Sequence, residues 1–251
     1  MRRLALAFLA CVAASPAAAE KLISTVSTNS VQITSSFDGT TLSLFGTIEP
    51  ESPAEILTGP YNTIVIITGP LQDRVTRLKT NSFGIWTNTE QVAFKQFPSF
   101  YAVLASGRLE NIASTEVLLD ERILPTDQAR MAAVDGGTPK AMQFGAELVR
   151  LMTAQKHFAV REDGVRYLSD TAYVAQLTLP SDVANGPFLT HTLILKDKRV
   201  VAQSTDGFSV RKSGIENFVY VMSRQQPLLY GLVCVALALA TGWLAGVVFK
   251  R

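Results

Sequence analysis

The chain has 251 residues, 47% of them hydrophobic, and a formal net charge of +2 at pH 7. Four basic residues lie at the chain ends, so residues 20–226 hold 19 basic and 21 acidic side chains, which excludes a basic nucleic-acid-binding body. The two cysteines, Cys11 and Cys234, fall in terminal apolar segments, which excludes disulfide scaffolds, zinc ribbons and thiol catalysis in the region between them.

The first 19 residues have the pattern of a secretory signal peptide. Arg2 and Arg3 form a charged start, residues 4–14 form a short apolar run, and Ala17-Ala-Ala supplies small residues for cleavage before Glu20. The run is too short to span comfortably the roughly 30 Å of hydrocarbon in a bilayer. We therefore predict a signal peptide over residues 1–19, with an uncleaved anchor as the alternative.

Residues 20–122 are predicted to form a first β-sandwich-like region. Leu42 and Leu44 alternate with polar residues after a turn at Asp38-Gly, which is typical of a half-buried strand. The run Ile64-Val-Ile-Ile is apolar throughout, as expected for a strand that is buried on both faces. Further short strands are expected around Val31, Val75, Ile85-Trp, Val92 to Phe94 and Tyr101 to Ala105.

Four aromatic residues in this region are candidate contact residues. Phe97, Phe100 and Tyr101 crowd a segment that contains Pro98, and Trp86 lies close by in the sequence. Exposed aromatic clusters are typical of docking surfaces, whereas buried ones are ordinary core packing. The sequence leaves both alternatives open.

The middle of the chain changes from strand-like to helix-like patterns. Residues 112–122 and 129–134 are expected to form short helices. Thr138-Pro is a strong helix start, because threonine caps the first turn and proline fits the first helical position. An amphipathic helix is predicted over residues 140–156 on the spacing of Phe144, Leu148, Leu151 and Gln155.

Residues 123–223 are predicted to contain this helix and then a second β-sandwich-like region. The expected strands are Arg166 to Leu168, Ala172 to Leu179, Phe188 to Lys196, Val200 to Ser204 and Phe208 to Lys212. Turns are predicted at Asn185-Gly and Asp206-Gly. The fold class is therefore mainly β, an immunoglobulin-like sandwich ectodomain, organised either as two halves around a short helical middle or as one elongated domain.

An uncharged segment near the C-terminus predicts one transmembrane helix over residues 228–249. It has 22 residues, enough to cross a bilayer with some tilt. The tail at 250–251, Lys250-Arg, carries positive charge that should remain cytoplasmic. With a cleaved signal, this topology predicts a periplasmic body anchored in the inner membrane.

A stripe of small residues repeats along this predicted helix. Ala238, Gly242 and Gly246 recur every four residues and would let a second helix approach closely. The stripe is therefore a possible packing face for another integral-membrane protein or for a second copy. The alternative is that small residues are simply common in spanning helices.

A search for chemical motifs predicts no catalytic, cofactor-binding or metal-binding residues. His191 alternates with leucines on a predicted strand, and His157 lies off the helix face that carries Met142 and Met152, so neither indicates a ligand set. Ser209-Val-Arg-Lys matches the Ser-x-x-Lys of acyl-serine enzymes, but it falls in a predicted strand and lacks the partner motifs.

Several short segments of the chain resemble one known family. They are Gly46-Thr-Ile, Thr68-Gly-Pro, Phe83-Gly-Ile-Trp-Thr-Asn, Pro98-Ser-Phe-Tyr-Ala, Leu179-Pro-Ser-Asp-Val-Ala-Asn-Gly, Arg211-Lys-Ser-Gly-Ile-Glu, Pro227-Leu-Leu-Tyr-Gly and Gly242-Trp-Leu-Ala-Gly-Val-Val-Phe. On these segments the chain resembles the alphaproteobacterial putative transmembrane protein family, whose members have about this length, a signal peptide, an external body and one C-terminal span. The resemblance implies this architecture and brings no catalytic residues with it.

These features together predict a non-enzymatic accessory or protein-interaction module that works beside an inner-membrane transporter or complex. The alternative is a membrane-tethered domain that binds a small solute or a metal ion at the membrane surface. A third possibility, an anchored hydrolase, would require Ser209 or His191 to be essential.

Overall fold

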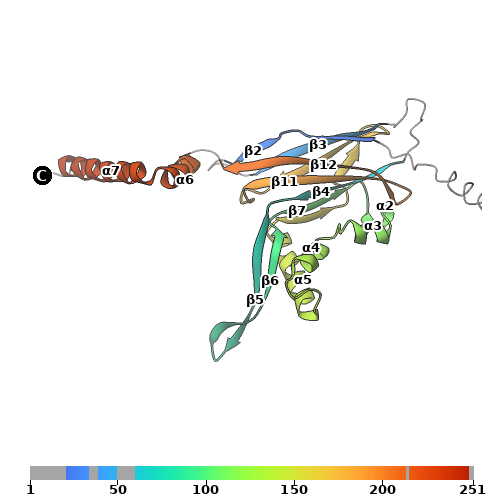
Figure 1. Ribbon diagram of the computed structural model, residues 1–251, viewed down its shortest axis with the longest axis horizontal. Coiled ribbons are helices and arrows are strands. Elements are labelled where there is room, and N and C mark those ends of the chain that lie inside the picture. Colours follow the sequence, from blue (N-terminus) through green and yellow to red (C-terminus); the bar gives the residue numbers. More distant parts are fainter. Residues whose placement is uncertain (1–20, 34–38, 50–59, 213–214, 249–251) are drawn as a thin grey trace, which may run out of the picture.

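The computed structural model describes residues 21–33, 39–49, 60–212 and 215–248. The predicted signal peptide, Asp38, Phe249 and the tail at 250–251 lie outside these residues. Figure 1 shows a layered β-rich body, a two-stranded ribbon that projects from it, and a pair of consecutive helices at the C-terminal end.

The body is mainly β, as predicted. Its strands are β1 (Lys21–Val26), β2 (Ser30–Ile33), β3 (Thr40–Glu49), β4 (Asn62–Thr68), β5 (Leu71–Ser82), β6 (Ile85–Pro98), β7 (Tyr101–Ala105), β8 (Phe158–Arg161), β9 (Val165–Tyr167), β10 (Ala172–Leu179), β11 (Gly186–Lys196) and β12 (Arg199–Lys212). Its helices are α2 (Leu109–Ile112), α3 (Thr115–Asp120), α4 (Pro125–Ala132) and α5 (Pro139–Ala154), and α6 (Ile215–Gln225) and α7 (Pro227–Val248) follow the last strand.

The strands that precede and follow the helical middle are paired with each other. One sheet has the order β1-β3-β10-β9, and a larger sheet has the order β2-β12-β11-β4-β7-β8. In the first, β3 pairs with β10, and in the second, β4 pairs with β11. Strands from the two predicted β regions thus share both sheets.

The larger sheet is covered on both faces. Val65 and Ile67 of β4 belong to a core cluster shared with the smaller sheet. Ile64 and Ile66, which alternate with them, belong to a second cluster shared with the helices and the base of β6. The prediction that the apolar run of β4 is buried on both faces is confirmed, because four of its side chains are divided between two cores.

Helix α5 begins as predicted and is turned slightly from the predicted face. The Thr138 side chain accepts a hydrogen bond from the Ala141 N–H at 3.2 Å, which caps the first turn. The buried stripe consists of Ala141, Gly145, Leu148 and Met152, whereas Leu151 is exposed. Glycine at 145 allows close packing, since a Cβ there would lie 3.2 Å from Ala129 Cβ on α4.

One predicted turn is wrong. Asp206-Gly lies inside β12, where Gly207 pairs with Leu189, so it is not a turn. The chain reverses instead at Asp197 and Lys198, whose positive φ values of 50° and 63° are those of a tight hairpin turn. The long register between β11 and β12 fixes the turn at this point, which overrides the local preference of an Asp-Gly pair for a turn.

The short strands expected around residues 75, 85 and 92 are parts of one long hairpin. Strands β5 and β6 have 12 and 14 residues and form a two-stranded sheet of their own. Two register shifts, at Gln72/Arg74 and Leu78/Lys79, interrupt the ladder. Such bulges increase the local twist of a hairpin.

A tight contact inside the sandwich gives a test of the packing between β3 and β10. Gly46 pairs with the fully buried Tyr173, and a Cβ at position 46 would lie 2.3 Å from the tyrosine oxygen. We predict that Gly46→Ala lowers the free energy of unfolding by about 1–3 kcal/mol, because overpacking forces the ring or the strand to move. The measurement is urea unfolding of the full chain in detergent.

Gly231→Ala is the matched control for this substitution. A Cβ at Gly231 in α7 would meet no atom within 4 Å, and alanine favours the helix. Unchanged unfolding of Gly46→Ala would contradict the described contact between Gly46 and Tyr173.

Candidate interaction surface

Three of the four predicted contact aromatics are core residues. Phe97, Phe100 and Tyr101 are 0%, 1% and 2% exposed, so they are removed from the candidate surface. Phe97 stacks on Phe158 with ring centroids 5.3 Å apart, and the Tyr101 hydroxyl donates a hydrogen bond to the Ile123 carbonyl at 3.0 Å. Their crowding in the sequence reflects the packing of two cores and not a docking patch.

Trp86 differs from these three residues, because it is 66% exposed. It lies near the turn of the β5–β6 hairpin, and its role in contacts stays a prediction. The hairpin is fixed at its base, where Val92, Phe94 and Phe97 are buried in the helix-side core. Beyond this base, residues 85–91 of β6 are all exposed, and the part of the hairpin past the contact of Glu90 with Lys140 stands free of the body (Figure 1).

The turn of the hairpin carries an apolar residue in an unusual conformation. Phe83 is fully exposed and has a φ of 52°, and the next residue, Gly84, has a φ of 82°. Positive φ at both central positions is the pattern of a type I′ turn, which favours Asn-Gly over a bulky residue followed by glycine. The Gly84 N–H donates to the Asn81 side-chain oxygen at 2.9 Å, which closes the turn.

A groove runs between the hairpin and α5. It has a volume of about 620 Å³. Its apolar lining includes Leu78 of β5 and Phe144 and Leu151 of α5. The groove could not be predicted from the sequence, because its two walls are adjacent only after the hairpin has folded against the helix.

Charged residues surround the apolar floor of the groove. Lys140 Nζ lies 2.7 Å from Glu90 Oε2 and 5.8 Å from the centre of the Phe144 ring, so this lysine links the hairpin to the first turn of α5. Both partners of the ion pair are about half exposed, and such pairs contribute at most about 1 kcal/mol. Arg77 and Glu147 complete a mixed rim, which suits a partner segment with an apolar centre and polar flanks.

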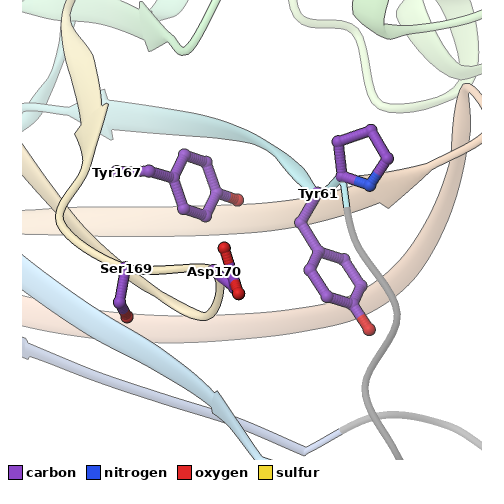
Figure 2. Close-up of a pocket in the computed structure, with 5 residues that line it drawn as sticks. Tyr61, Tyr167, Ser169 and Asp170 are labelled. Atoms are coloured by element: carbon purple, nitrogen blue, oxygen red, sulfur yellow. The ribbon is translucent and has the colours of Figure 1, made fainter.

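A second opening lies at one end of the sandwich. It has a volume of about 540 Å³ and is lined by Pro60, Tyr61, Tyr167, Ser169 and Asp170. Figure 2 shows the Tyr167 phenol and the Asp170 carboxylate on one side and the Tyr61 ring on the other. The Tyr167 hydroxyl shares a hydrogen bond of 2.6 Å with Thr63 Oγ1. The lining combines aromatic rings with one carboxylate, a combination that can hold a small cationic or polar molecule.

The two histidines lie apart from these surfaces. His157 is mostly buried after α5, with Nε2 3.1 Å from Asp182 Oδ1, and His191 lies in β11 opposite Thr205. Across residues 21–33, 39–49, 60–212 and 215–248, no group of three or more His, Cys, Asp or Glu side chains is arranged to hold a metal ion. Ser209 lies in strand β12, as the sequence predicted.

Helix α7 is long and apolar enough to cross a membrane, and it is the one such helix among the described residues. Its exposed surface carries leucine and valine side chains. A Cβ added at Gly242 or Gly246 would meet no atom within 4 Å, so the small-residue stripe with Ala238 is uncovered in the single chain. Helix–helix packing through this stripe stays a prediction.

Comparison with known proteins identifies one family. The family described as "Putative transmembrane protein" (Alph_Pro_TM) matches residues 21–251, which covers the body and the C-terminal helix. A search of curated proteins finds no match to the chain.

Buried tyrosines predict how stability depends on alkaline pH. Burial raises the pKa of Tyr167 and of Tyr173 to about 12. The folded state thus favours the neutral phenol. The stabilisation that results is fully present below pH 10, which is the ordinary pKa of a tyrosine side chain. We predict that the free energy of unfolding falls as the pH rises from 10 to about 12.

Urea unfolding of the full chain at a series of pH values measures this dependence. Tyr167→Phe should make the decline less steep, because one of the groups that ionises only in the unfolded chain has been removed. A decline with the same slope in Tyr167→Phe would contradict the role of this tyrosine.

Proposed function

The chain belongs to the putative transmembrane protein family described above, and from this premise we propose that it is a non-enzymatic accessory protein that holds a membrane-protein partner against its β-rich body. We further propose that α7 anchors it in the inner membrane, with the body in the periplasm and the C-terminus in the cytoplasm. The signal-peptide pattern of residues 1–19 and the basic pair Lys250-Arg support this orientation.

The observation that carries the proposal is the groove between β5 and α5. Leu78 and Leu151 are 46% and 45% exposed on its two walls, and with Phe144 they give the groove an apolar lining that an apolar segment of a partner can fill. A tethered body keeps such a groove close to other membrane proteins, so even a weak contact is favoured by the high local concentration. The geometry around Ser209 supports a role without catalysis, because Ser209 belongs to a strand, whereas Ser-x-x-Lys chemistry uses a helix.

Photocrosslinking in native membranes tests the proposal. A photoreactive residue at Leu151 of the full chain should capture an integral-membrane protein in near-stoichiometric yield, because this side chain faces the groove. The matched control is Gln176, which is exposed on β10 in the smaller sheet.

Charge reversal sharpens the same experiment. Lys140→Glu should reduce the yield at Leu151, because it places two acids where Lys140 now pairs with Glu90. Equal yields of the same adducts at Leu151 and Gln176 would overturn the proposal.

A second candidate function, solute binding, is favoured by the opening around Tyr61 and Asp170. Tyr167 and Asp170 in its lining suit a small organic cation, which would share the opening with Lys196, whose Nζ lies 5.3 Å from the centre of the Tyr61 ring. Calorimetry of the full chain with a quaternary ammonium probe such as choline should then give saturable heat that Asp170→Asn removes. Asp135→Asn is the control, since it removes the same charge from an exposed acid that does not line the opening. Absence of saturable heat in the unsubstituted chain would count against this candidate.

A further inference from the structure

We propose that the tip of the β5–β6 hairpin inserts into the headgroup region of the lipid bilayer, as a second membrane contact besides α7. The tip consists of Phe83, Ile85 and Trp86, all exposed in the folded chain. This inference goes beyond the proposed function, because it concerns lipid and a part of the hairpin that does not line the groove.

The three apolar side chains of the tip lie on different sides of the hairpin. Ser82 pairs with Ile85 and Asn81 pairs with Trp86, so Ile85 and Trp86 are neighbours on one strand and project from opposite faces. Phe83 occupies the turn itself. A protein that docks on one face of a hairpin would cover one of these groups and leave the others in water. A lipid interface surrounds the tip and accommodates all three.

The conformation of Phe83 adds an independent argument. A φ of 52° is unfavourable for a large aromatic residue, and Asn would suit the same position better. The folded chain offers Phe83 no packing in return, because the side chain is fully exposed. Positions that break a local structural rule without compensation inside the fold are typically functional.

Polar and basic residues follow the apolar tip in the order expected at a bilayer surface. Thr80 and Thr87 come next along the two strands, Lys79 pairs with Asn88 beyond them, and Arg77 lies further from the turn. Aromatic side chains favour the headgroup region, and Lys and Arg beside them attract anionic headgroups. The acid in this half of the hairpin, Glu90, faces Lys140 at 2.7 Å and so does not oppose that attraction.

The position of the hairpin is compatible with a membrane contact. The 12 residues of β5 extend for about 40 Å at the usual rise of a strand. Figure 1 shows the hairpin leaving the body as a separate arm, at a steep angle to the axis of α6 and α7, with its tip on the side of the body from which α6 leaves. Both the hairpin and the body precede α7, which is the one candidate span among the described residues, so the tip lies on the same side of the membrane as the body.

Tryptophan fluorescence of the full chain tests the proposal directly. The chain has two tryptophans, so Trp243→Phe leaves Trp86 as the one reporter. This protein is reconstituted into vesicles of phosphatidylethanolamine and phosphatidylglycerol whose acyl chains carry bromine close to the headgroup. We expect brominated lipid to quench Trp86 emission and the bilayer to protect it from acrylamide. Full acrylamide access with no lipid quenching would overturn the proposal.

The matched variant is Phe83→Asn combined with Ile85→Thr in the same background. Both sites are exposed, Asn suits the positive φ and Thr suits a strand, so the hairpin should form as before. We expect loss of the lipid quenching and a shift of Trp86 emission to longer wavelength. Undiminished lipid quenching in this variant would also overturn the proposal.

A second measurement separates lipid from protein as the occupant. A photoreactive residue at Ile85, activated in native membranes, should form adducts that mass spectrometry identifies as phospholipid. A defined protein adduct without phospholipid would overturn the proposal and identify the tip as a protein-docking element. This outcome is independent of crosslinking at Leu151, which reports on the groove.

Discussion

The structure depends on a central sheet that must be buried on both faces. Strand β4 presents Val65 and Ile67 to one core and Ile64 and Ile66 to the other. Neither the smaller sheet nor the helices could cover both faces alone, so the chain supplies a layer to each side. The base of the hairpin is part of the second layer, and its free half is therefore supported by the same packing that stabilises the body.

Much of this architecture could be predicted from the sequence because it rests on local patterns. The strand over residues 172–179 and the threonine-capped helix after residue 138 were predicted almost to their ends. Pairing between distant strands could not be predicted, because period-two alternation shows that a strand has a buried face without showing what covers it. The same limit explains the Asp206-Gly error, where a long register with β11 outweighed local turn preference.

The candidate surfaces were less predictable than the fold. Phe97, Phe100 and Tyr101 stood out as aromatics, yet they fill the two cores. The exposure of Phe83 and Leu78 could not be predicted, because it depends on how far the hairpin extends beyond its support. One signal in the sequence was available at this turn. A residue followed by glycine between two alternating segments, here Phe83-Gly, is typical of a two-residue turn. The bulky phenylalanine at the first position marks this turn as unusual.

The interleaved sheets also constrain how the chain can acquire its structure during synthesis. Strands β3 and β4 are made early, but their partners β10 and β11 lie more than a hundred residues later. Until those partners emerge, long apolar edges remain unpaired and prone to aggregation. Strand β12 completes the large sheet shortly before α7 begins, so the body closes only when the anchor itself is being made. Folding and membrane integration thus fall in the same interval, and a chain truncated before β10 would leave both sheets open.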